Sequence, residues 1–427
     1  MRRLDFTRMS EAEKKTSLER SAVNLAKAIE TAREISTLTR SMGLEAVLSF
    51  ARKYDQYDRD NILVSEEEIA AAGSELTAIQ RTAIEKAAEN IAKFHQAQKP
   101  KSYTIETSPG VVCERVFTPI ENVGVYIPGG TAALPSTALM LGIPAKIAGC
   151  KRVVLATPAK KKVPPAVLFA AAICGIKEIY AVGGAHAISM LAYGIEEIPK
   201  VDKIFGPGNQ FVTAAKMLVS TDPKGCAFDM PAGPSEIIIV ADKNARPEFI
   251  AADFLSQAEH GADSQAILFS DSDEILEKVA VEIEVQKKSL LRQEYINKSL
   301  EHSALILTSS IKEAFKSVNY YAPEHLVLHI DNARSYMPMI QNAGSVFLGN
   351  YSPESAGDYA SGVNHALPTS GFARSFGGVS VESFMKSMTV QELTKDGLAG
   401  LSETICTIAD IEQLDAHKRA VTIRFEK

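Results

Sequence analysis

The hydrophobic positions between residues 10 and 100 have a helical periodicity. Apolar residues recur there at near-helical spacing, as at Leu25, Ala28 and Ile29, which predicts a run of helices. Ser65 and Glu68 match the S-x-x-E pattern of a capping box and predict a helix start. A further predicted helix stops before Pro100, because proline cannot continue it. The first hundred residues are therefore expected to be mainly helical.

From residue 103 onward, short apolar runs alternate with helical patterns, and several of the runs end in glycine. The expected strands cover residues 103–105, 111–117, 122–127, 152–156, 178–182, 203–205, 236–240, 266–269, 304–307 and 325–329. The expected helices cover residues 137–148 and 167–174, the stretches after Gly184 to 192 and after Gly208 to about 219, and residues 247–260. Strands that alternate with helices predict parallel sheets with crossover helices. The alternation restarts after residues 231–235, which indicates two consecutive α/β units.

The length of the chain sets the expected domain organisation. Its 427 residues are too many for one typical core and fit two or three domains. We therefore expect an α/β fold with two incomplete Rossmann-like parallel-sheet domains, a helical N-terminal segment and a small C-terminal tail domain. Beyond about residue 379 the tail has a short β-like run and then a helix from near Asp410. Because the tail is too short to form a core of its own, it should pack against another surface.

Composition narrows the class of protein. The net charge is −6, so the chain lacks the basic footprint of a nucleic-acid-binding protein. Its five cysteines are odd in number and include no C-x-x-C pair, which argues against a disulfide framework and a cysteine zinc cluster. The N-terminus has no apolar stretch typical of a signal peptide, and no segment reaches the ~18 apolar residues of a membrane span. We expect a cytoplasmic protein that binds neither nucleic acid nor membrane.

Two motifs place ionisable side chains close together. Gln257 and His260 are three residues apart, so on a helix they share one face and could hold a metal ion, although a polar helix end has the same pattern. Glu324 and His325 enter an apolar strand side by side, and at the mouth of a strand both can reach one cleft. An acid beside a base suits proton transfer in two directions. A solvent-exposed strand start is the alternative interpretation.

Further candidates lie nearer the C-terminus. Residues 352–365 form a long Gly- and Ser-rich stretch that is typical of a functional or mobile loop. Within it, Asp358 is a candidate hard metal ligand and His365 is a second option. His417 lies in the predicted terminal helix, where a plain surface histidine is the alternative.

The sequence motifs give only weak evidence for a nucleotide-binding site. No G-x-G-x-x-G motif is present, since Gly206-Pro-Gly208 lacks the third glycine. What remains is a set of glycine-ended strands that lead into helix N-termini, which bind phosphates in general.

Read together, seven ordered segments resemble the histidinol dehydrogenase family along nearly the whole chain. They are Val-Gly-Val-Tyr126-Ile-Pro-Gly-Gly-Thr, Phe205-Gly-Pro-Gly-Asn209, Ala232-Gly-Pro-Ser235-Glu, Leu255-Ser-Gln257-Ala-Glu-His260-Gly, Ala322-Pro-Glu324-His325-Leu, Ser355-Ala-Gly-Asp358-Tyr and Ala416-His417-Lys. Seven segments in family order and at family-like separations are far beyond a chance match.

The resemblance implies an enzyme that oxidises L-histidinol through L-histidinaldehyde to L-histidine with NAD, in the last steps of histidine biosynthesis. It implies a homodimer with shared active sites. In similar proteins one zinc ion per subunit is bound by residues matching Gln257, His260, Asp358 and His417, the last supplied by the partner subunit. The implied substrate contacts are these four residues together with Ser235, Glu324, His325 and Glu412.

The resemblance also implies a cofactor site and a domain layout. NAD contacts are implied for Tyr126, Asn209 and His186, and at His186 relatives commonly have Gln, so the shape and charge of that pocket differ here. The implied layout has an N-terminal arm (1–22), a larger α/β domain with the zinc and substrate residues (23–122 and 236–378), an inserted Rossmann-like NAD-associated domain (123–235) and a C-terminal tail that packs on the partner subunit (379–427).

The chemistry of the implied residues agrees with this role. A Gln, His and Asp ligand set without thiolates suits zinc and would also accept manganese or cobalt. Such a metal would position the substrate rather than activate water. In the expected mechanism His325 is the general base and Glu324 activates the water that attacks the aldehyde. The alternatives are a paralogous zinc and NAD alcohol dehydrogenase for another small hydroxy compound, and a zinc hydrolase that uses Glu324 with a metal-bound water.

Overall fold

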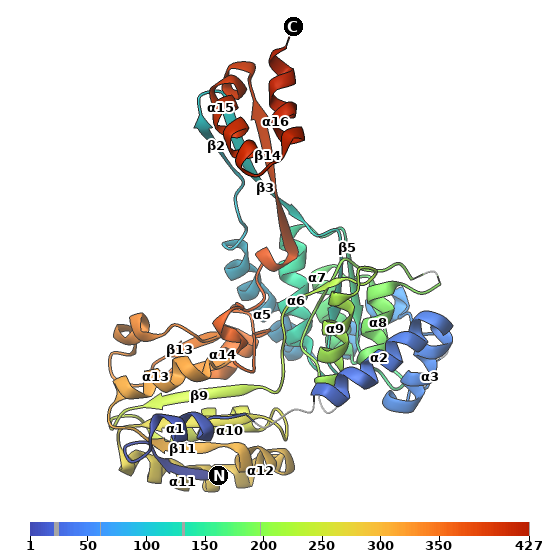
Figure 1. Ribbon diagram of the computed structural model, residues 1–427. Coiled ribbons are helices and arrows are strands. Elements are labelled where there is room, and N and C mark those ends of the chain that lie inside the picture. The colour runs from blue at the N-terminus through green and yellow to red at the C-terminus, as the bar shows by residue number, and fades with distance from the viewer. Residues whose placement is uncertain (21–24, 60, 130–132, 197, 427) are drawn as a thin grey trace.

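Two parallel β-sheets and one antiparallel sheet organise the chain (Figure 1). The computed structural model describes all residues except 21–24, 60, 130–132, 197 and 427. The last two residues of the first family-like segment, Gly130 and Thr131, therefore lie outside the described residues. The predicted α/β fold with two parallel-sheet units and a helical N-terminal segment is confirmed.

The larger sheet has six parallel strands in the order β1-β11-β10-β9-β12-β13. They are β1 (Arg2–Asp5), β9 (Glu236–Ala241), β10 (Gln265–Ser270), β11 (Ala304–Leu307), β12 (His325–His329) and β13 (Ser345–Leu348). On one face Ile237 and Ile239 pack with α10 (Pro247–Ala258), α11 (Asp273–Gln286) and α12 (Gln293–His302). On the other face Ile238 and Val240 pack with α13 (Ile311–Tyr321). Because helices cover both faces, the central strands are apolar throughout rather than alternating.

The smaller sheet has five parallel strands in the order β6-β5-β4-β7-β8. They are β4 (Asn122–Tyr126), β5 (Arg152–Ala156), β6 (Glu178–Tyr180), β7 (Lys203–Phe205) and β8 (Ala227–Phe228). One core joins this sheet to α6 (Pro135–Ala148) and α7 (Pro165–Cys174), and a second core joins it to α8 (Gly184–Tyr193) and α9 (Gln210–Thr221). The strand and helix ranges expected from the sequence match these elements closely, except that the two-residue strand β8 was not expected.

Helices α2 to α5, between residues 25 and 96, pack on the smaller sheet's helices. Helices α2 (Leu25–Met42) and α3 (Leu44–Asp55) contact α8, and α2 also contacts α9. Helices α4 (Glu66–Ala71) and α5 (Ala78–Gln96) contact α7 and α6, respectively. The predicted capping box of Ser65 and Glu68 starts α4. The grouping of residues 23–122 with residues 236–378 in one domain, which the family resemblance implies, stays a prediction.

The N-terminal arm belongs to the larger sheet. Strand β1 pairs with β11 at the edge of that sheet, and α1 (Glu11–Ser17) follows it. Arg20 then binds Glu236 through two hydrogen bonds of 2.6 and 2.8 Å, so the arm is fixed at the start of β9. Strands β1 and β13, both short, were not expected from the sequence.

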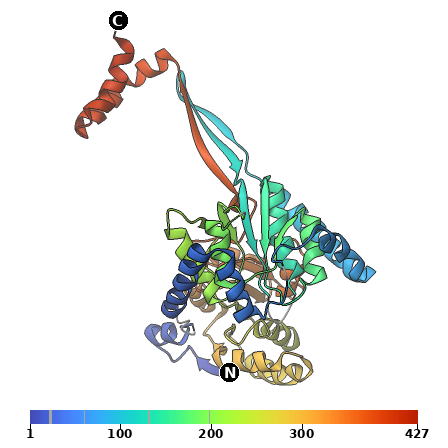
Figure 2. The same ribbon diagram turned by 90° about the vertical axis from the view of Figure 1, so that its right-hand side faces the viewer.

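A long antiparallel ribbon carries the C-terminal tail. Strand β3 (Val111–Pro119) pairs with β2 (Tyr103–Ser108) and, over nine residues, with β14 (Met385–Leu393). The ribbon projects from the two parallel-sheet units and bears α15 (Lys395–Ile411) and α16 (Asp415–Thr422) at its far end (Figures 1 and 2). Apolar side chains of α15 are open to solvent, with Ile408 50% exposed and Ile411 75% exposed.

Two expectations for the C-terminal part were wrong in detail. The tail helix begins at Lys395 rather than near Asp410, with Thr394 accepting a hydrogen bond from the backbone N–H of Gly397. Gly397 and Gly400 lower the helix propensity of its first turns, which hid the start of the helix in the sequence pattern. The stretch 352–365 is not all loop, since Glu354–Tyr359 form the short helix α14.

No helix in the described part of the chain is both long and apolar enough to cross a membrane. The five cysteines are unpaired, and Cys174 and Cys226 are buried.

Candidate active site

The amino-terminal edge of the larger sheet gathers most of the candidate residues. Glu324 directly precedes β12, and His325 is its first residue. Ser235 directly precedes β9, the neighbour of β12, and is half-buried. Parallel neighbouring strands begin at the same edge, so residues far apart in sequence meet there.

Glu324 and His325 are buried, which rejects the exposed strand start. Their exposed fractions are 6% and 3%. One carboxylate oxygen of Glu324, Oε2, accepts a hydrogen bond of 3.0 Å from the backbone N–H of Glu236. The same oxygen lies 3.6 Å from Nδ1 of His325. The acid and the imidazole therefore form one couple despite their adjacent positions on a strand.

Burial sets the protonation of this couple. It lowers the pKa of His325 to about 3, so the imidazole is neutral and has a free lone pair at neutral pH. Burial, helped by the neighbouring carboxyls of Glu236, Glu354 and Asp358, raises the pKa of Glu324 well above its ordinary value. A carboxyl with a raised pKa is a stronger base, as a group that takes a proton from water requires.

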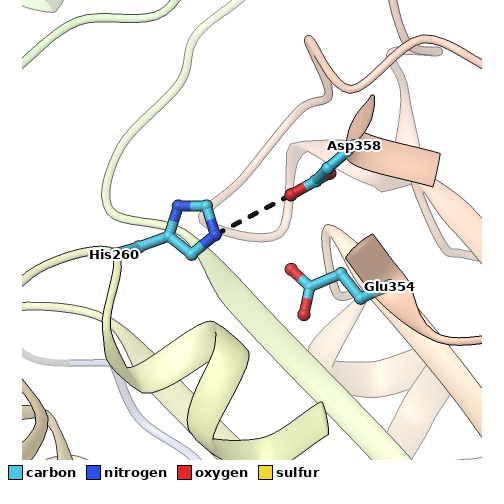
Figure 3. Close-up of side chains that lie close together, drawn as sticks. All are labelled: His260, Glu354 and Asp358. Carbon is cyan, nitrogen blue, oxygen red and sulfur yellow. Dashed lines mark ion pairs between the residues drawn. The ribbon is translucent and has the colours of Figure 1, made fainter. Parts of the chain in front are cut away.

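Three of the four expected metal ligands lie at this edge. His260 Nε2 is 3.8 Å from Asp358 Oδ2 (Figure 3). The other oxygen of Asp358 is 3.8 Å from Nε2 of His325. Gln257, on the last turn of α10, is completely buried, and neither its Oε1 nor its Nε2 has a hydrogen-bond partner. An amide buried without partners is costly, so it indicates a missing ligand.

The donor set fits a divalent metal ion such as zinc. Desolvation by the surrounding protein lowers the pKa of His260, although 40% of its side chain is exposed, and this imidazole is neutral and able to coordinate. Burial raises the pKa of Asp358 to about 7, and a bound cation would displace that proton. The amide oxygen, imidazole and carboxylate are ligand types that zinc accepts.

Glu354 is a site residue that sequence reasoning missed. It is 1% exposed, and one ligand atom each of His260, Glu354 and Asp358 lies within 4.8 Å of the others (Figure 3). Glu354 and Asp358 are four residues apart on α14, so they share a helix face. That spacing is visible in the sequence, but it places two side chains on one face only in a helix. From its sequence, this stretch is instead typical of a loop.

His365 supports the site from outside. Its Nδ1 lies 2.9 Å from the backbone oxygen of Asp358, and its Nε2 lies 3.2 Å from Oγ1 of Thr137. Both ring nitrogens are therefore engaged, which disfavours the second-option ligand role. Because Thr137 is in the first turn of α6, this bridge links the site to the smaller sheet's unit.

Glu412 and His417 are not near this edge within one chain. Both are exposed on the tail, where α16 packs on α15. The ribbon holds these helices away from the larger sheet (Figures 1 and 2).

A cavity of about 740 Å³ lies over the smaller sheet's unit, and Tyr126, His186 and Asn209 all line it. The hydroxyl of Tyr126 accepts a hydrogen bond of 3.1 Å from the backbone N–H of Gly184, and Asn209 caps the N-terminus of α9. The N-caps of α6 and α7, Leu134 and Pro164, also line the cavity and offer no side-chain cap. Uncapped helix N-termini present N–H groups and positive dipole ends, which suit the phosphates of a dinucleotide.

His186 is the unusual member of this cavity. It is 1% exposed, and burial lowers its pKa to about 4, so it is neutral. Neither ring nitrogen has a hydrogen-bond partner, and Nε2 lies 3.8 Å from Oδ2 of Asp55. An imidazole in this state can donate or accept one hydrogen bond, as a Gln side chain can.

A buried ion pair fixes the loop that carries Asn209. Lys216 Nζ lies 2.5 Å from Oδ1 of Asp229 and donates 2.7 Å to the backbone oxygen of Gly206. The other oxygen of Asp229 accepts from the backbone N–H of Gly206 at 2.7 Å. Gly206 has φ +121°, and a Cβ there would lie 2.1 Å from the backbone oxygen of Tyr126, so this position requires glycine.

Lys216→Met is expected to lower the free energy of unfolding by about 3–5 kcal/mol, because it leaves Asp229 buried and unpaired. The dissociation constant for NAD should rise as the Gly206 loop loosens. Urea unfolding and NAD titration measure the two effects. As a control, Lys216→Met combined with Asp229→Leu should recover part of the stability, since no charge remains unpaired. A single variant as stable as wild type would contradict the role of the ion pair.

Comparison with known proteins relates the whole chain to a family. The Histidinol dehydrogenase family model matches residues 18–425. The chain is 50% identical to a histidinol dehydrogenase of Aliivibrio fischeri over 428 aligned residues, covering 100% of this chain and 97% of that protein. It is 49% identical to one of Vibrio parahaemolyticus, with coverage of 100% and 99%. The crystal structure of histidinol dehydrogenase from Elizabethkingia anophelis superposes with a TM-score of 0.93 at 45% identity, covering 100% of this chain and 98% of that one.

Proposed function

The chain belongs to the histidinol dehydrogenase family, an oxidoreductase family, and we propose that it oxidises L-histidinol through L-histidinaldehyde to L-histidine with two molecules of NAD. The observation that carries this proposal is the buried couple of Glu324 and neutral His325 beside the ligand-type side chains of His260 and Asp358. Two oxidations with a hydration between them need a reusable base and a group that activates water, and the couple offers both.

The proposal assigns zinc to Gln257, His260 and Asp358 of one chain with His417 of the partner subunit, and NAD to the cavity lined by Tyr126, His186 and Asn209. When bound, zinc would hold the substrate's nitrogens in place, and NAD would accept hydride in each oxidation. The unpartnered Gln257 amide and the uncapped helix N-termini of the cavity support these assignments.

The chain's own residues move the protons. His325 takes the hydroxyl proton of histidinol in the first oxidation, since its lone pair is free. As Glu324 takes a proton from the water that adds to the aldehyde, His325 gives its own proton to the carbonyl oxygen, which becomes a hydroxyl of the hydrate and leaves His325 neutral again. His325 then takes a proton from the resulting hydrate in the second oxidation. The aldehyde stays in a buried site throughout, which prevents loss of a reactive intermediate.

A homodimer completes the proposed site. The exposed apolar side chains of α15, and of Leu414 and Ile423 on either side of α16, suit burial against a second copy of the chain. The substrate contact at Glu412 would then come, like His417, from the partner subunit's tail.

The proposed function predicts a stoichiometry. Two NADH molecules should form for each histidinol consumed, and a zinc chelator should abolish the reaction until zinc is restored. NADH absorbance against histidinol consumption measures the ratio. A panel of other small amino alcohols serves as the control and should give much slower NADH production. A ratio of one, or full activity in the chelated enzyme, would contradict the proposal.

A further inference from the structure

We propose that Glu354 is a positioning residue that holds the ring of His325 in its working orientation. The inference deepens the proposed function and rests on it, since His325 is the base of that reaction. No part of the family-like segments named above includes Glu354, and its role follows from its contacts alone.

The contact between the two side chains is direct and buried. Oε1 of Glu354 lies 3.1 Å from Nδ1 of His325, and the side chains are 1% and 4% exposed. Neither atom forms a fully aligned hydrogen bond in the described part of the chain, and their 3.1 Å approach is a close polar contact. The competing oxygen, Oε2 of Glu324, is farther away at 3.6 Å and already accepts a backbone hydrogen bond. Glu354 is therefore the nearest side-chain partner for Nδ1.

The rest of the site holds Glu354 itself in place. Its second oxygen, Oε2, accepts a hydrogen bond of 3.2 Å from Oγ of Ser256, which directly precedes Gln257 on α10. Asp358 follows Glu354 by one turn of α14. The two carboxyls thus share one helix. Glu354 contacts His325, and Asp358 faces His260 (Figure 3).

The consequence is a fixed direction for the working nitrogen. With Nδ1 turned to Glu354, Nε2 points to the side of Asp358, where it lies 3.8 Å from Oδ1. That is the side where the proposed metal ligands would place the substrate hydroxyl. Without this partner, the imidazole of His325 can rotate about its Cβ–Cγ bond. A displacement of the working nitrogen by about 1 Å costs on the order of 10²-fold in rate.

Two variants separate positioning from charge. Glu354→Met removes the oxygen and keeps much of the volume, so kcat for histidinol should fall about 10²-fold while KM stays within about threefold. Glu354→Gln keeps an amide oxygen for Nδ1 and offers its NH₂ to Ser256, so it should retain kcat within about tenfold of wild type. Zinc content should be unchanged in both variants.

A matched control uses the other buried histidine pair of the same strand. His329, at the far end of β12, lies 2.8 Å from Oδ2 of Asp253. Asp253→Leu removes the acceptor of that histidine and should lower Tm, but it should leave kcat within about threefold. A control variant that lost as much activity as Glu354→Met would assign the loss to general damage and overturn the inference.

Several results decide the matter. If kcat falls as far in Glu354→Gln as in Glu354→Met, the reaction requires the charge of Glu354 rather than the orientation that it gives His325, and the inference is wrong. Loss of zinc in either variant would make Glu354 a ligand instead. A crystal structure of Glu354→Met in which the His325 ring keeps its orientation would also overturn the inference. This test does not depend on which substrate the enzyme uses. Wild-type enzyme that makes no NADH from histidinol would contradict the proposed function, and the crystal structure would still decide the positioning role.

Discussion

His325→Asn is expected to lower kcat for histidinol oxidation by about 10²–10⁴-fold, the size of a general-base contribution. Asparagine can fill the space at the start of β12 but cannot take a proton. Because the same imidazole is proposed to act in both oxidations, the variant should also fail on added L-histidinaldehyde. Glu324→Gln should behave differently, since it removes the base for water attack and leaves the first oxidation nearly intact.

The two half-reactions can be measured separately. NADH formation from histidinol and from added aldehyde should both collapse in His325→Asn, whereas in Glu324→Gln the aldehyde reaction should be slowed more than the first oxidation. His95→Asn is a suitable control, because His95 is equally buried but lies on α5. Conversion of the aldehyde at the normal rate by Glu324→Gln would show that another group activates the water.

Mixed dimers of His417→Ala and His260→Ala chains are expected to regain activity that neither variant has alone. In such a dimer one site combines an intact His260 with His417 of the partner subunit, and the other site lacks both. With complete random exchange, half of the dimers are mixed and each has one good site, so about a quarter of the wild-type activity should return.

A second pair of variants controls for non-specific rescue. His260 and Asp358 are proposed to serve the same site from the same chain, and they lie 3.8 Å apart. Mixing His260→Ala with Asp358→Ala should therefore restore nothing. No recovery in the first mixture, with exchange demonstrated by differently tagged chains, would refute a site shared between subunits.

Much of the fold was predictable because its signal is local. The run Ile237–Val240 predicts a buried strand by its own composition, and Ser65 with Glu68 predicts the start of α4. The packing of α2 and α5 was not predictable, because it depends on which apolar surfaces meet in three dimensions. The bounds of strand β14 and helix α15 were also hard to predict. Most of their residues are exposed, so no clear periodicity of apolar positions marks them.

The residues of the candidate site also differ in how far local sequence could predict them. Pairs close in sequence, such as Gln257 with His260 or Glu324 with His325, could be singled out from spacing. Glu354 could not, because its role depends on a 3.1 Å contact with a residue on another element. The placement of Tyr126, His186 and Asn209 around one cavity needed the family resemblance, since no glycine fingerprint marks it.

The ribbon of β3 and β14 also makes the proposed enzyme sensitive to dilution. It holds His417 beyond the reach of its own chain's larger sheet, so a lone subunit would keep three of the four proposed metal ligands. Below the concentration at which subunits associate, metal retention and catalysis should fade together. A newly made copy would then remain inert until it met a second one.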